Sequence, residues 1–451
     1  MLKKFVIKNL FNRTDVEVSL KRGVNIFIGE NGIGKTTILS LLNAFLTYDV
    51  KAITKTMFDS VTFFFEKHQI SFSFENIKRL YLNSFQRRHY YESERYYDKR
   101  REYSSSVYFE RLARLVKIIG KDTVNIIKNG SARSIRNILQ QAKLEAGEEI
   151  DFFDVEFLVD LNSESISVLE KLNDLQFFLN CEVLYFPTFR RIETDLSHFN
   201  LPEEAVKEIT RSKTMNFGMG DVENTLNSKL NIIDNEIRQG FNKMTTTLLG
   251  QYVNHTPLYA SNIDIDELTT ILSILSDSLP ESLINNIEEM MKTGEIYRAE
   301  NQQLLNLLNC LMRIYEDQKA NLNSIEKFVA VCNSYFYNKN ILFDRNKLKV
   351  EIRDEYSSII KFAELSSGEK QMVSIFSKLY LDNDKKYFVL FDEPELSLSI
   401  EWQQKLIPDI VSSGNCRQLF AVTHSPFIFQ NEYDETARSL QACMRGKYAN
   451  D

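Results

Sequence analysis

Apolar and polar positions alternate with a period of two near the N-terminus, which predicts β-strands at Phe5–Lys8 and Val16–Leu20. The next strand, Val24–Ile28, is apolar except for Asn25 and rich in β-branched residues. Two more continuous apolar segments, Tyr387–Phe391 and Leu419–Val422, lie near the C-terminus. Continuous apolar strands are typical of a parallel sheet that is covered on both faces. The pattern therefore predicts one sheet that draws strands from both ends of the chain.

Apolar residues at helical spacing predict helices next to these strands, at Thr36–Phe45, Glu369–Leu381 and Glu401–Val411. Strands that alternate with helices indicate an α/β fold. We predict a head built from residues 1–75 and 340–451, with a largely helical insertion at 76–339.

The insertion has its clearest helical patterns at Val222–Met244 and Glu300–Asn333. A short apolar strand near residues 183–186 interrupts it and could return to the sheet of the head. No heptad pattern persists along the insertion, so we expect no long coiled coil. Short hairpins are predicted at residues 61–74 and 341–352.

Composition narrows the class of protein. The chain has 451 residues, of which 43% are hydrophobic, and a net charge of −7, which gives no overall attraction to nucleic acid. The five cysteines form no CxxC pair, which indicates reduced thiols and no zinc site. No apolar run approaches the roughly 18–20 residues that a membrane span needs. We expect a cytoplasmic protein without a membrane partner.

The insertion is strongly polarised in charge. Ile77–Lys143 holds 16 Lys or Arg against 6 Asp or Glu, whereas Leu144–Glu182 holds 1 Lys against 11 acids. The basic segment interleaves arginines with tyrosines, a pairing that suits an acidic protein or a nucleic acid. A solvated helix with internal ion pairs, or a contact between the two charged segments, would explain it equally. The arginines chosen as candidates for binding a partner are Arg87, Arg88, Arg100 and Arg101.

The segment Gly29–Thr36 reads GENGIGKT and fits the phosphate-binding pattern GxxxxGK[ST]. It follows a predicted strand and opens a predicted helix, so backbone N–H groups at the helix start would face phosphates. Lys35 would reach the β- and γ-phosphates, and the Thr36 hydroxyl would bind Mg²⁺. The candidate nucleotide-binding residues here are Asn31, Gly32, Gly34, Lys35, Thr36 and Thr37.

A pair of acids, Asp392 and Glu393, follows the buried strand Tyr387–Phe391. In open α/β sheets, ligands bind at the carboxyl ends of the strands, where these side chains are expected. We predict that Asp392 holds Mg²⁺ and that Glu393 acts as the general base on the attacking water.

Two further elements complete the predicted site. LSSGEKQ, residues 365–371, places Ser366, Ser367, Gly368 and Glu369 at the start of a helix, where an anion could bind. A serine N-cap without any ligand would explain these residues as well. His424 lies just beyond the strand Leu419–Val422 and could hydrogen-bond a γ-phosphate oxygen.

The four motifs, in this order, resemble the ABC ATPase family, in the branch of the SMC-like DNA-repair ATPases and the OLD family. The resemblance implies that ATP, with Mg²⁺, binds between two heads. Ser366 to Glu369 would then contribute in trans, and His424 would act as the switch histidine. The opening VIKNLFNRTDVEVSL resembles the same branch and implies that Asn12 borders the nucleotide base.

Within this branch, ELSLSIEWQQKL, FGMGDVENTL and VLYFP resemble compact ATPases of prokaryotic anti-phage systems. The size and layout of the chain most resemble the AriA family of PARIS systems. The PtuA family of Septu and retron systems is the second choice. The AriA resemblance implies a homo-oligomer larger than a dimer, such as a hexamer. It also implies a separate Toprim-type toxin nuclease, AriB, and phage proteins, including acidic ones, as triggers. Only 27 residues follow His424, too few for a nuclease domain, so we expect no intrinsic nuclease activity. A DNA-handling repair ATPase or clamp is the alternative.

Overall fold

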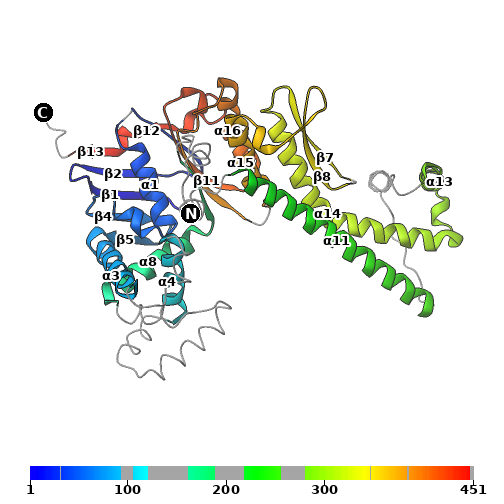
Figure 1. Ribbon diagram of the computed structural model, residues 1–451, viewed down its shortest axis with the longest axis horizontal. Coiled ribbons are helices and arrows are strands. Elements are labelled where there is room, and N and C mark those ends of the chain that lie inside the picture. Colours follow the sequence, from blue (N-terminus) through cyan, green and yellow to red (C-terminus); the bar gives the residue numbers. More distant parts are fainter. Residues whose placement is uncertain are drawn as a thin grey trace, which may run out of the picture. The chain divides into compact units, whose positions relative to one another are not determined.

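The computed structural model describes residues 1–30, 32–92, 105–119, 161–187, 218–254, 280–345, 347–382 and 385–446. The chain divides into two compact units. Unit 1 comprises Met1–Asn216 and Lys385–Asp451, and unit 2 comprises Phe217–Asp384. Each unit is described by itself below (Figure 1).

The central feature of unit 1 is a parallel five-stranded sheet with the order β12-β3-β11-β10-β6. β3, β10 and β11 come from the two ends of the chain, as the apolar segments predict, whereas β6 comes from the middle of the sequence. Residues of β10 are buried along the whole strand, which explains why its sequence does not alternate. The strands are β3 (Gly23–Ile28), β6 (Glu182–Phe186), β10 (Tyr387–Asp392), β11 (Cys416–Thr423) and β12 (Ala437–Ser439).

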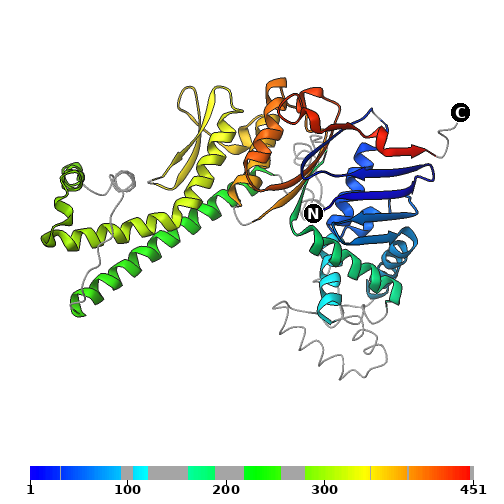
Figure 2. The same ribbon diagram turned by 180° about the vertical axis from the view of Figure 1, so that it is seen from behind.

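A second sheet in unit 1 is antiparallel and has the order β13-β2-β1-β4-β5. In Figures 1 and 2, β2, β1, β4 and β5 are the blue strands, and β13 is the red strand beside β2. The hairpin expected at residues 61–74 is confirmed as β4 and β5. Its strands are β1 (Lys4–Leu10), β2 (Thr14–Ser19), β4 (Ser60–Phe64), β5 (Gln69–Ser73) and β13 (Met444–Gly446).

One apolar core joins the two sheets of unit 1. Phe420 of β11 is fully buried, and its ring lies 6.1 Å from that of Phe5 and 5.0 Å from that of Phe27. Phe45 of the first helix packs against Phe63 of β4, so the helix and the antiparallel sheet share this core. The helix that follows the phosphate-binding pattern is therefore fixed to the body of unit 1.

The helices of unit 1 surround these sheets. α3, α4 and α8 pack together, and α8 also contacts β5. At the start of α8, Asn162 accepts a hydrogen bond from the backbone N–H of Ser165, which is an ordinary N-cap. The helices are α1 (Lys35–Leu46), α2 (Val50–Ile53), α3 (Phe74–Glu92), α4 (Ser105–Ile119), α8 (Ser163–Leu179) and α16 (Ile400–Ser412).

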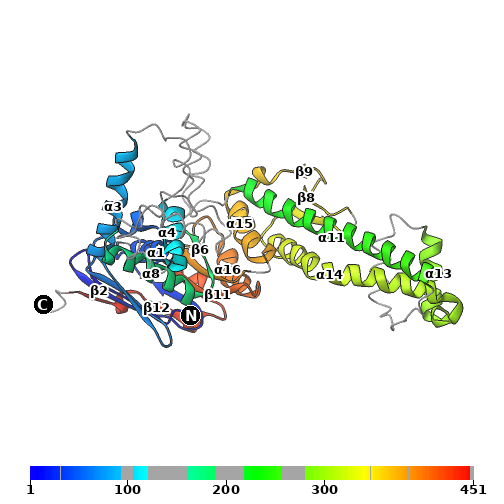
Figure 3. The same ribbon diagram turned by 90° about the horizontal axis from the view of Figure 1, so that it is seen from below.

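Unit 2 contains two long helices, α11 and α14, that lie side by side (Figure 3). At Gly240 of α11 they approach so closely that a Cβ atom would lie 2.8 Å from Ile314 Cγ1 of α14. α15 packs against both helices. The helices are α11 (Met219–Asn254), α13 (Glu281–Lys292), α14 (Gln302–Asn333) and α15 (Ser367–Leu381).

A small antiparallel sheet completes unit 2, and β7 packs on α14. The hairpin predicted at residues 341–352 is confirmed as β7 and β8, with Ile341 opposite Ile352 on the buried side. The strands are β7 (Lys339–Asp344), β8 (Lys349–Asp354) and β9 (Ile359–Ile360).

The units divide the chain at positions other than those we expected from the sequence. α3, α4 and α8, which we had placed in the insertion, belong to unit 1, where β6 pairs with β10. Residues 340–384, which we had placed in the head, belong to unit 2, because β7 and α15 pack on α14. These associations depend on contacts between segments distant in sequence, which apolar periodicity does not report.

α11 extends ten residues beyond the helix end predicted at Met244. Three consecutive threonines, Thr245, Thr246 and Thr247, lower the helical propensity there. The helix nevertheless continues, and each hydroxyl donates a hydrogen bond to the carbonyl four residues earlier, at 2.9, 3.0 and 2.8 Å. Within the described parts of the chain, no helix is long and apolar enough to cross a membrane.

Candidate functional site

The phosphate-binding pattern lies between β3 and α1, as the sequence predicts. Gly34 precedes α1 with a φ of 93°, and Gly32 has a φ of 86°, a region that favours glycine. Among the described residues, no side chain caps the first turn of α1, so its backbone N–H groups can donate hydrogen bonds to an anionic ligand. The Thr36 side chain is exposed at this end and Thr37 is partly exposed, whereas Asn31 lies outside the described residues.

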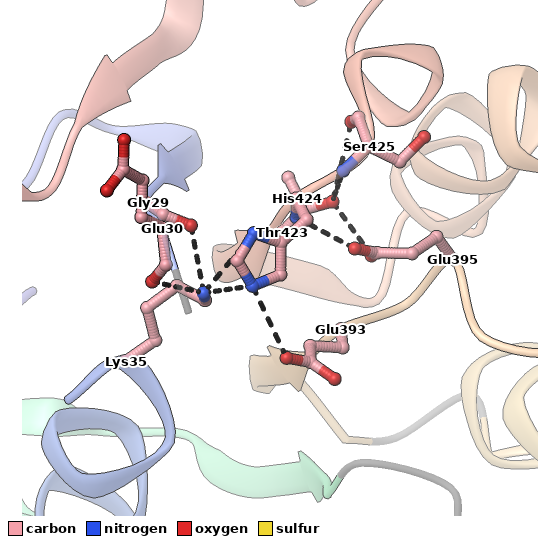
Figure 4. Close-up of polar contacts among 8 residues, drawn as sticks. All are labelled: Gly29, Glu30, Lys35, Glu393, Glu395, Thr423, His424 and Ser425. Carbon is pink, nitrogen blue, oxygen red and sulfur yellow. Dashed lines mark hydrogen bonds and ion pairs between the residues drawn. The ribbon is translucent and has the colours of Figure 1, made fainter. Parts of the chain in front are cut away.

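Lys35 is the buried cation of this loop, with 5% of its surface exposed. Its Nζ donates hydrogen bonds to the carbonyl oxygens of Gly29 at 2.9 Å and Glu30 at 3.0 Å (Figure 4). It also contacts Nε2 of the His424 imidazole. Burial lowers the pKa of Lys35, and nearby carboxylates, Glu393 foremost, act in the opposite direction.

The two predicted acids follow β10 directly. Asp392 ends the strand and is 1% exposed. Glu393 adopts a φ of 49°, an uncommon conformation for a residue with a side chain, and its N–H donates to the Val422 carbonyl at 2.9 Å. Strained backbone of this kind concentrates at functional sites. Glu393 Oε1 lies 3.6 Å from Nε2 of His424.

His424 therefore contacts both Lys35 and Glu393, so three predicted site residues from three segments meet at one point (Figure 4). Both contacts use Nε2, which can accept a hydrogen bond from Lys35 in one tautomer or direct an N–H toward Glu393 in the other. Sequence reasoning found these three residues from their motifs. Their roles toward a nucleotide stay predictions.

Sequence reasoning missed Glu395, which lies beside this group. Its Oε1 accepts a hydrogen bond from the backbone N–H of His424 at 2.7 Å, and its Oε2 accepts one from the Thr423 hydroxyl at 2.7 Å. The spacing of Glu395 three residues after Asp392 is visible in the sequence, but its partners are known only once β10 and β11 are paired.

The segment LSSGEKQ lies in unit 2, at the start of α15. Ser366 is the N-cap, and it forms a capping box with Glu369, whose Oε2 accepts from the Ser366 N–H at 2.7 Å. The serine N-cap considered from the sequence is therefore present. Ser367 is exposed at the first position of the helix, and Gly368 is buried behind it.

Lys339 of β7 is a second residue that sequence reasoning missed. Its ammonium contacts both carboxylate oxygens of Glu369, at 3.1 and 2.8 Å. Burial raises the pKa of Glu369, but the hydrogen bonds from Lys339 and Ser366 outweigh it and hold the pKa below its ordinary value. The start of α15 is thus tied to β7.

Two other groups of candidate residues have simpler outcomes. Asn12 is exposed in the turn between β1 and β2, with a φ of 60°. Arg87 and Arg88 fall within α3, but their side chains, like Arg100 and Arg101 altogether, lie outside the described residues.

The residues of unit 1 fit ATP with Mg²⁺. An uncapped helix start and a buried ammonium are suited to phosphates. The Thr36 hydroxyl and the Asp392 carboxylate are hard oxygen donors of the kind that Mg²⁺ prefers.

A family model described as the AAA ATPase domain matches residues 1–429 of the chain. The chain belongs to the AAA ATPase domain family. The match covers all of unit 2 and the part of unit 1 up to residue 429, so both units belong to one family domain in this AAA ATPase. It follows that the chain is an ATPase, with the mixed α/β fold and parallel sheet that the sequence predicts.

Two solved structures are similar to this AAA ATPase. One is the SmcHead bound to the C-winged helix domain of ScpA. The other is the Smc head domain with an extended coiled coil bound to the C-terminal domain of ScpA derived from Pyrococcus furiosus. Each is 11% identical, covers 95% of this chain and 90% of its own, and has a TM-score of 0.33. The comparison with curated proteins gives no match.

Proposed function

We propose that the chain hydrolyses ATP by the ABC-type mechanism, with Lys35, Glu393 and His424 as its central residues. The contact of His424 with both Lys35 and Glu393 supports this proposal most directly. Through these contacts, the Lys35 ammonium that would bind the phosphates, the Glu393 carboxylate that would activate the water and the His424 imidazole lie close together. ATP hydrolysis itself follows from membership of the AAA ATPase domain family.

The arrangement suggests how these side chains act. Lys35 is held on two carbonyls and on His424, so a phosphate would offer its ammonium a stronger, charged acceptor. Glu393 would then be released from His424 to orient water and take its proton. Mg²⁺, held by Thr36 and Asp392, would supply charge neutralisation on the phosphates.

We also propose that each site is completed by Ser367 from a second copy of the chain. Ser366 is used as the cap of α15, whereas the Ser367 hydroxyl is exposed beside the backbone N–H groups of the same helix start. Such a helix start favours an anion. The ABC resemblance implies that this anion is the γ-phosphate of an ATP molecule bound to the other copy.

Mixing two inactive variants tests the shared site. Lys35→Ala and Ser367→Arg should each lose ATPase activity alone. Equimolar mixing, with exchange of subunits, should restore about a quarter of the wild-type rate, because about half of all dimers are then heterodimers and each heterodimer holds one intact site of two. Steady-state phosphate release measures the rate.

Ser228→Arg is the matched control, since Ser228 is also an exposed helical serine of unit 2. It should keep full activity alone. Mixed subunits that exchange, shown by two different affinity tags, and yet stay inactive would contradict a site shared between copies.

For biological role, we propose an anti-phage sensor and scaffold of the AriA type that assembles into a homo-oligomer such as a hexamer. It would hold a separate Toprim-type nuclease inactive until an acidic phage protein is detected. The motif resemblance supports this role. A DNA-handling ATPase or clamp is the competing function.

A reconstitution experiment separates these roles. The purified chain should show no nuclease activity with ATP and Mg²⁺ or Mn²⁺, and it should co-purify with a co-expressed Toprim-type nuclease encoded beside it. ATPase activity stimulated by DNA, without binding of that nuclease, would favour the clamp instead. An unrelated Toprim protein serves as the binding control.

A further inference from the structure

We infer that Glu395 is a positioning residue that sets the place of the His424 imidazole. This inference rests on the proposed ATPase function of the same site. Glu395 lies in the segment between β10 and α16, two residues after Glu393. Through Glu395, the segment that carries the general base also holds the segment that carries the histidine.

The carboxylate of Glu395 accepts two hydrogen bonds from the C-terminal end of β11 and the residue that follows it. Oε1 accepts from the His424 backbone N–H and Oε2 from the Thr423 hydroxyl, both at 2.7 Å (Figure 4). Thr423 is fully buried, and the side chain of Glu395 is partly buried, so water competes weakly for these bonds. Two charge-assisted bonds from one carboxylate fix orientation as well as distance.

The residues beyond His424 continue the same network. The Ser425 N–H donates to the Thr423 hydroxyl oxygen at 2.9 Å, and the Ser425 hydroxyl donates to Gln403 Oε1 at 2.6 Å. Gln403 lies in α16 and donates in turn to the Leu398 carbonyl at 3.0 Å. The turn that carries His424 is therefore anchored on both sides.

This anchoring determines how far His424 lies from Glu393. The Glu393 N–H is bonded to Val422, and Glu395 is bonded to the two residues that follow Val422. The two strand ends thus have a fixed register, and the imidazole Nε2 lies 3.6 Å from Glu393 Oε1. Displacing a reacting group by about 1 Å can cost about 10²-fold in rate.

An electrostatic role for Glu395 is the competing explanation, because its charge also acts on Lys35. Glutamine distinguishes the two. Its amide oxygen can accept from the His424 N–H, and its amide N–H can donate to Thr423 Oγ1. The Thr423 hydroxyl can then turn to the Ser425 carbonyl, which is 3.4 Å away. Glu395→Gln therefore keeps the geometry and removes the charge.

The experiment measures ATP affinity, kcat and KM for the full chain carrying Glu395→Ala, Glu395→Gln or Thr423→Val. We expect Glu395→Ala to lower kcat about 10²-fold with ATP affinity nearly unchanged. Glu395→Gln should stay within about tenfold of wild type, and Thr423→Val should fall between them. Glu401→Gln, an exposed acid of α16, is the matched control and should behave as wild type.

A double-mutant cycle shows whether Glu395 acts through the histidine. In a His424→Ala background, adding Glu395→Ala should cause little further loss, because the group that it positions is already absent. Additive losses, an equal loss for Glu395→Gln and Glu395→Ala, or full activity of Glu395→Ala would each overturn the inference. If the wild-type chain itself hydrolysed no ATP, the proposed function would fail instead. Should Glu395→Ala not fold, the Glu395→Gln and Thr423→Val variants decide the question.

Discussion

Glu393→Gln should bind ATP about as well as the wild type but hydrolyse it about 10²–10⁴ times more slowly, the usual cost of losing a general base. Glutamine keeps the length of the side chain and can still hold water, but it cannot take a proton. The φ of 49° at this position is no harder for glutamine than for glutamate, so the backbone should be unaffected. Single-turnover hydrolysis and equilibrium binding of a fluorescent ATP analogue measure the two properties.

The control for this variant is Glu432→Gln, at an exposed acid elsewhere in unit 1. It should keep the wild-type rate. If Glu393→Gln hydrolysed ATP as fast as this control, another residue would have to act as the base. A loss of ATP binding would show that Glu393 has a role in affinity instead.

Lys35→Ala should prevent ATP from binding at concentrations that saturate the wild type. Removing one partner of a buried charge pair costs about 2–5 kcal/mol, and Lys35 is the buried cation of the loop. Alanine also releases the Gly29 and Glu30 carbonyls from their shared donor. Isothermal titration with ATP and Mg²⁺ measures the affinity.

Lys35→Met separates charge from packing, because methionine fills much of the same space without an ammonium. Both variants should bind ATP equally poorly. Lys51→Ala, at an exposed lysine of α2, is the matched control and should bind normally. Tight binding by Lys35→Met would mean that the loop, not the charge, holds the phosphates.

Local pattern was enough to predict the elements that position the site. β3, β10 and β11 are mostly buried on both faces, so each contains a run of apolar residues that is visible in the sequence. The glycines before Lys35 are needed for left-handed backbone, and that requirement is visible as a motif. For the same reasons, Asp392 and Glu393 could be recognised from their place after a strand.

Contacts between distant segments could not be predicted in this way. Glu395 becomes informative only beside Thr423 and His424, and Lys339 only beside Glu369. β12 is three residues long and polar in two of them, so its pairing with β3 leaves no periodic trace. The predicted domain boundary differs from the observed units for the same reason: β7 and α15 belong to unit 2 because they pack on α14, which composition does not show.

The parallel sheet also constrains when the site can form during synthesis. β3 ends at Ile28, but its partner β11 begins only at Cys416. A ribosome that adds about 5–20 residues per second would need about 20–80 s to bridge that interval. Until β10 and β11 have been made and have joined β3 in the sheet, Glu393 and His424 cannot lie near Lys35. A nascent chain that stalls before β10 would therefore expose apolar β3 to chaperones and could not yet hydrolyse ATP.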